Sequence, residues 1–148
     1  MKRSLAVVCV LVAAALVGTG CVQVFRHSPS AAAVGASDFV RVLMVEKDAR
    51  AAYAMTDASF QQGRTLAVFE SRTKGSPGYG AITGVAATAY EPVPSQPAID
   101  IFLTGRGGAV TYYYAVRMSG TQDAGYKPAS LTLSNNPFPA TDTRKSLP

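Results

Sequence analysis

The chain has 148 residues and a formal net charge of +5, from 14 Lys and Arg against 9 Asp and Glu. These charges are dispersed and form no block of one sign, so the pattern argues against a nucleic-acid partner. Both cysteines, Cys9 and Cys21, lie near the N-terminus, and the only histidine is His27. The remainder therefore has no disulfide, no cysteine or histidine metal site and no histidine acid–base catalyst, and we expect no metal and no cofactor.

Residues 1–20 have the pattern of a secretory signal peptide. Two basic residues precede an uncharged stretch from Leu5 to Phe25, and small residues follow its most apolar part. That part is shorter than the about 20 residues of a spanning helix, although the whole uncharged stretch reaches a spanning length. Because a basic N-terminus stays inside, we expect the bulk of the chain on the extracytoplasmic (periplasmic) side of a bacterial cell envelope.

Cys21 is the candidate lipidation site. The small residues before it resemble the lipobox of bacterial lipoproteins, in which the signal is cleaved and the cysteine becomes the lipidated first residue. A lipobox usually has leucine three places before the cysteine, where this chain has Gly18. Three alternatives stay open: a lipoprotein, an uncleaved membrane anchor, and a secreted protein without its signal. In the first two, the membrane is a partner through the lipid or the anchor helix.

Helices are predicted directly after a tether. Residues 21–35 are rich in Ser, Pro and Ala and are interpreted as that tether. A first helix has Ser37 as its N-cap, and a second starts at Asp48. A capping box, Ser59 with Gln62, opens a third helix that ends where a Gly- and Pro-containing turn begins.

Beyond this turn the apolar residues recur with a period of two, which is typical of strands. Four strands are predicted, at 84–90, 98–104, 109–119 and 126–134, and glycine-containing hairpin loops join the last three. Helices followed by an antiparallel meander is the order of an α+β fold. We therefore predict one α+β domain over residues 36–137, with N-terminal helices packed on a curved antiparallel sheet, and a disordered tail at 138–148.

Two phrases of the chain carry a family resemblance. The first, "EKDARAAYAMTDASF", contains Lys47-Asp48, Ala52-Tyr53 and Ser59-Phe60, and the second, "GYKPASLTL", contains Gly125-Tyr126-Lys127, Leu131 and Leu133. Together they resemble small bacterial proteins of the NTF2-like, or cystatin-like, superfamily, with tyrosine at 126 where tryptophan is commoner. The resemblance implies a strongly bent sheet around a long helix, with a cone-shaped pocket. Members of the superfamily include enzymes, ligand-binding proteins and interaction modules, so it implies no particular activity.

On the expected inner face of the sheet, Tyr112 and Tyr114 are the candidates for contacting a ligand. Asp100 is the only carboxylate within the predicted strand interiors, and strand parity points it away from the apolar face. A carboxylate–tyrosine enzyme of isomerase or dehydratase type would need Asp100 to turn into the pocket. We therefore assign no catalytic residue.

Three aromatic residues of the opposite parity, Tyr90, Phe102 and Tyr113, are expected together on the outer face. Cross-strand aromatic pairs stabilise a sheet without any partner. A docking surface for another protein, or cover by the chain's own tail through Phe138, would also account for them.

The sequence thus predicts a membrane-tethered, extracytoplasmic binding or accessory protein, a non-catalytic interaction module attached to a membrane protein complex. A pocket for a small apolar ligand is the first alternative. The carboxylate–tyrosine enzyme is the second.

Overall fold

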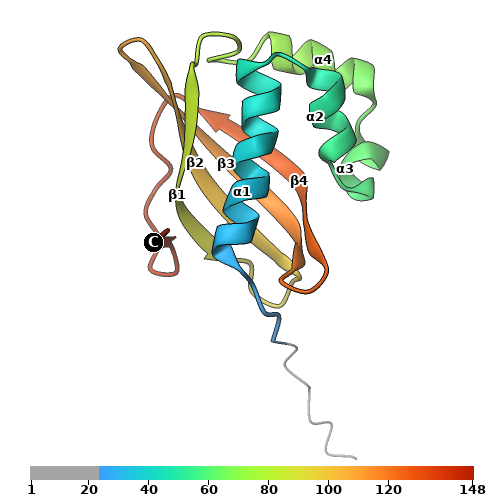
Figure 1. The fold of residues 1–148 in the computed structure, drawn as a ribbon, viewed down its shortest axis with the longest axis vertical. Coiled ribbons are helices and arrows are strands. Elements are labelled where there is room, and N and C mark those ends of the chain that lie inside the picture. The colour runs from blue at the N-terminus through green and yellow to red at the C-terminus, as the bar shows by residue number, and fades with distance from the viewer. Residues whose placement is uncertain (1–23) are drawn as a thin grey trace, which may run out of the picture.

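Residues 24–148 are described by a computed structural model (Figure 1), and both the predicted signal, 1–20, and Cys21 lie outside this range. Within it, no helix combines the length and the apolar character needed to cross a membrane. Helices precede strands, as predicted. The helices are α1 (Pro29–Val40), its π-helical continuation η1 (Arg41–Val45), α2 (Ala49–Met55), α3 (Ala58–Gly63) and α4 (Leu66–Lys74).

The first helix starts at Pro29, earlier than predicted, so residues 29–35 of the segment predicted as a tether, 21–35, belong to a helix instead. Ser28 caps α1 by accepting a hydrogen bond from the Ala31 N–H at 3.4 Å. Pro29 stands in the first turn, where its missing N–H is not needed. The alanine run that suggested a linker is instead a strong helix-forming segment, so Ser37 is an interior residue of α1.

Small side chains let α1 lie directly against the sheet. Ala32 and Ala36 are fully buried. A side chain at Gly35 would come within 3.0 Å of Met118 Cε in the sheet, so only glycine fits without displacing that methionine. The folded domain therefore includes residues 29–35, which the sequence pattern had assigned to the tether.

Each of the three short helices begins with a side-chain cap. Asp48, as predicted, accepts from a backbone N–H of α2, and Asp57 and Thr65 do the same for α3 and α4. The third predicted helix is thus two helices, because Arg64 adopts extended backbone between them. The cap of α3 is Asp57, so the capping box predicted at Ser59 is wrong by two residues.

Five antiparallel strands form one sheet in the order β4-β3-β2-β1-β5. They are β1 (Gly84–Pro92), β2 (Ala98–Gly107), β3 (Val110–Thr121), β4 (Gly125–Ser134) and β5 (Lys145–Ser146). Both predicted hairpins are present, joining β2 to β3 and β3 to β4. Figure 1 shows α1 crossing one face of the sheet, with α2, α3 and α4 gathered beside its upper end.

The core lies between α1 and this inner face. The strand parity predicted for β2 and β3 is confirmed: Ile99, Ile101, Leu103, Tyr114, Val116 and Met118 are at most 1% exposed. From the helical side, Phe39, Val40, Leu43 and Met44 are fully buried against them. An α+β fold with helices packed on an antiparallel sheet is therefore established for the described residues.

A bulge in β1 reverses the predicted orientation of Tyr90. The register of β1 against β2 shifts between Ala87 and Ala89, which leaves Thr88 without a partner residue. One extra residue in a strand moves the side chains beyond it to the other face. Tyr90 therefore pairs with Ile101 and packs against the core, and the prediction of an outer-face position is wrong.

The segment predicted as a disordered tail, 138–148, is folded back along β1. The N–H of Leu147 donates to the carbonyl of Thr88 at 3.1 Å, and β5 pairs with Ala89 and Tyr90. The segment is short and polar, and its contacts are with a strand far away in the sequence. The sequence pattern therefore did not predict them. We call residues 137–147 the C-terminal strap.

Candidate functional site

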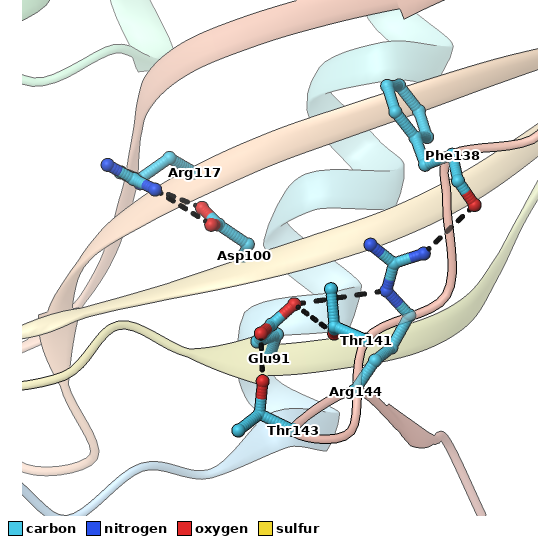
Figure 2. A network of polar contacts seen from close by, with 7 residues as sticks. All are labelled: Glu91, Asp100, Arg117, Phe138, Thr141, Thr143 and Arg144. Atoms are coloured by element: carbon cyan, nitrogen blue, oxygen red, sulfur yellow. Dashed lines mark hydrogen bonds and ion pairs between the residues drawn. The ribbon is translucent and has the colours of Figure 1, made fainter.

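The outer face of the sheet carries a polar network centred on Glu91 (Figure 2). The Thr141 hydroxyl donates to Glu91 Oε2 at 3.0 Å, and the Thr143 hydroxyl donates to Oε1. Arg144 Nε lies 3.9 Å from Glu91 Oε2, and Arg144 Nη1 donates to the carbonyl of Phe138 at 3.2 Å. One carboxylate thus holds three residues of the C-terminal strap on the sheet.

An aromatic contact holds the strap a few residues earlier. The rings of Phe102 and Phe138 lie 5.8 Å apart between centroids, and the Arg144 guanidinium carbon sits 3.6 Å from the centroid of Phe102. A cation over an aromatic face is attracted by the ring quadrupole. With Tyr113 these side chains border a hollow of about 160 Å³ under the strap. The predicted outer-face placement of Phe102 and Tyr113, and cover by the tail through Phe138, are both confirmed.

Asp100 lies on the same outer face, away from the core, as strand parity predicts. Its two carboxylate oxygens accept hydrogen bonds from Arg117 Nε and Nη2, each at 2.8 Å, across β2 and β3 (Figure 2). The hydrogen bonds that Arg117 donates to Asp100 raise the pKa of Arg117, which stays cationic. This carboxylate therefore serves to pair two strands.

The two inner-face tyrosines differ in their accessibility. Tyr114 is fully buried, its hydroxyl has no hydrogen-bond partner among residues 24–148, and burial raises its pKa to about 12. Gly78 and Gly105 pack close around its ring, since a side chain at either position would meet it within 3.0 Å. Tyr112 is half-buried beside Gly78. Tyr114 is thus a core residue closed to any ligand, and it lies on the opposite face from Asp100.

A groove lies between α1 and β1. It has a volume of about 390 Å³ and is bordered by Ser30, Ala33, Val34, Ser37, Asp38, Ala87, Leu147 and Pro148. Val34, in the middle of α1, is 64% exposed on the border of this groove. The groove runs beside the edge of β1, so one occupant could contact both elements.

Neither this groove nor the partners of Glu91 were predicted from the sequence. A long-range contact such as Thr141 with Glu91, 50 positions apart in the chain, leaves no periodic signal. The groove depended on the course of α1, which was assigned as a tether. The one usable signal was the alanine run, whose helix propensity favours a longer α1.

Among residues 24–148, no group of three or more His, Cys, Asp and Glu is placed to hold a metal ion. The two outer-face carboxylates described above are paired, Asp100 with Arg117 and Glu91 with the strap. Comparison with family models, curated proteins and solved structures found no match to this chain.

Proposed function

We propose that this chain is a membrane-tethered, extracytoplasmic accessory protein, a non-catalytic module that binds another protein at the membrane surface. The observation that carries the proposal is the groove between α1 and β1, with the exposed Val34 on its rim. Exposed apolar surface in a concave site is a common feature of protein-binding surfaces. A partner that covers Val34 would remove this side chain from water.

The position of α1 in the chain supports a location near the membrane. Cys21, the proposed lipidation site, precedes Pro29 by only a short segment. Even fully extended, that segment spans at most about 30 Å. A lipid on Cys21 would therefore keep the N-terminal half of α1, and the groove beside it, close to the bilayer.

For the finer fold class we propose the NTF2-like (cystatin-like) superfamily. A helix laid across an antiparallel meander, with the Gly125-Tyr126-Lys127 phrase at the start of the last long strand, supports this assignment. In this chain Tyr114 and Leu43 are fully buried where the superfamily would have its cone-shaped pocket. That filling favours the interaction modules of the superfamily over its enzymes and ligand-binding proteins.

The tether is tested by intact-mass analysis of the protein extracted from membranes. A diacylglyceryl group on Cys21 and an intact Met1 give very different masses, and Cys21→Ser should release a lipoprotein from the membrane fraction. A chain recovered from the cytosol with its leader intact would contradict the proposal.

The binding role is tested by co-purification in mild detergent, comparing Val34→Gln with Val68→Gln. Both valines are exposed on helices, at 64% and 42%, but only Val34 borders the groove. We expect Val34→Gln to lose the partner and Val68→Gln to keep it. Equal retention by both variants would contradict the groove as the binding surface.

A further inference from the structure

The outer edge of β1 is only partly covered. Within the described chain, β5 pairs with Ala89 and Tyr90, and the Leu147 N–H reaches Thr88, but no strand continues along residues 84–87. This uncovered stretch, which we call the free edge, has the sequence Gly-Val-Ala-Ala and carries neither a charge nor a proline. Charges and prolines are the usual devices that keep an edge strand from pairing with another chain.

The C-terminal strap shows what this edge accepts. Beside β1 it runs antiparallel, contributes backbone hydrogen bonds, and packs the side chain of Leu147 against the core. Pro148 follows at the border of the α1–β1 groove. The free edge therefore continues in line with a strand pairing that the molecule already makes.

The groove supplies a place for a side chain of an added strand. Ala33 and Val34 form the apolar part of its helical wall and Ala87 its sheet wall, while Ser30, Ser37 and Asp38 add polar groups on the helical side. An added strand would have alternate side chains pointing to one face, because side chains alternate along a strand. Every second residue of such a strand would point toward α1.

We infer that the free edge of β1 accepts an extended, uncharged segment of the partner protein as an added antiparallel strand, with an apolar side chain in the α1–β1 groove. This inference rests on the proposed function and names the mode of recognition. Main-chain hydrogen bonds would supply affinity, and the groove would supply specificity. A second copy of this chain is the poorer occupant, since four paired residues bury far less than the roughly 800 Å² per partner of a stable interface.

The test uses full-length protein in mild detergent and a displayed library of linear peptides of about ten residues, long enough for one strand. The strongest binder is synthesised, and its affinity is measured by fluorescence anisotropy on wild type, Val34→Gln and Val68→Gln. Amide hydrogen exchange, with and without the peptide, locates the contact. We expect slower exchange at residues 84–87, about tenfold weaker binding for Val34→Gln, and an unchanged affinity for Val68→Gln.

Three results would overturn the inference: no peptide enriched, protection confined to other strands, or equal affinities for the two variants. Doubling of the mass with concentration, removed by Val34→Gln, would overturn it in favour of a second copy. If co-purification depends on Val34 but no peptide binds, strand addition fails and the proposed function stands. If a peptide binds the free edge but the native chain carries no lipid and no leader in the membrane, the proposed function fails instead.

Discussion

The two edges of the sheet are joined to the rest of the molecule in different ways. On β4, Pro128 is buried and has no N–H to offer, and its carbonyl accepts from the Asp57 N–H at the start of α3 at 2.9 Å. The Asp57 side chain extends the link, because its Oδ2 accepts from the Ser119 hydroxyl at 2.7 Å. Near the start of β4, the Tyr126 hydroxyl accepts from the Ser28 N–H at 2.7 Å. The N-terminal ends of α1 and α3 thus hold this edge at Tyr126 and Pro128.

The opposite edge, on β1, is held by the last residues of the chain. Only Ala89 and Tyr90 pair with β5. Leu147 adds a backbone hydrogen bond to Thr88 and packs against the core, and the other contacts of the strap go to side chains on the outer face. The difference teaches that helices hold the edge on β4, whereas the last residues of the chain hold the edge on β1. Displacing or extending the C-terminal strap on β1 should therefore cost a partner less free energy than displacing the helices on β4.

The largest effect is expected at Asp57, which caps α3 and also holds β3 and β4. Asp57→Ala removes the acceptor for the Phe60 N–H, at 2.8 Å, and for the Ser119 hydroxyl. We expect a loss of about 2 kcal/mol in the free energy of unfolding, measured with urea. Asp48→Ala is the matched control, since Asp48 caps α2 through the Ala51 N–H alone, and about 1 kcal/mol is expected there. Equal losses would show that the link to β3 adds nothing.

The same link predicts a pH dependence. Burial alone would raise the pKa of Asp57, but hydrogen bonds from the Phe60 N–H and the Ser119 hydroxyl outweigh it and lower the pKa below 3.8. A lowered pKa in the folded state stabilises the protein fully above 3.8, and this contribution is lost as pH falls through the folded value. Asp57→Asn keeps a cap oxygen but cannot ionise. Its difference in unfolding free energy from wild type should therefore shrink as the pH is lowered, and a constant difference would contradict the assignment.

A smaller effect is expected at the strap. Phe138→Ala removes the aromatic contact with Phe102, so we expect a loss of about 1 kcal/mol in unfolding free energy. Because the strap protects the edge of β1, amide exchange at Ala89 and Tyr90 should become faster while exchange in β3 stays unchanged. Phe138→Leu, which keeps an apolar side chain, serves as the control and should lose less. Faster exchange throughout the sheet would mean that the strap is part of the cooperative core.

The contrast between the edges also separates what the sequence could reveal from what it could not. Alternation predicted β2 and β3 correctly, with Ile99 and Ile101 inward and Asp100 outward. A strand with one buried and one solvent-facing side has apolar and polar residues in alternation, and this pattern is visible in the sequence. The orientation of Tyr90 failed at a single-residue bulge, which composition does not mark. The start of α1 at Pro29 was not predicted for another reason. An Ala-rich segment can be a linker or a helix, and packing against a sheet decides between them.

The candidate site was harder to predict than the fold, because its parts meet only through tertiary structure. Phe102 and Phe138 were identified as possible contacts from parity and from an aromatic residue in a polar tail. The role of Glu91 could be recognised only once the strap was seen to fold back onto β1, and the groove only once the full length of α1 was known. Neither of these is encoded by a local pattern.

The smallest effect on stability, and the sharpest test of the contrast, is expected at the free edge. Ala86→Lys places a charge on an exposed outer-face position of β1, and the unfolding free energy should change by less than about 0.5 kcal/mol. A lysine there hinders pairing with another chain, so aggregation on mild heating, followed by light scattering, should slow. Thr132→Lys is the matched control, an exposed position on β4, whose edge lies next to α3. If aggregation slows equally in both variants, the two edges are equally open, and β1 is no more available to a partner strand than β4.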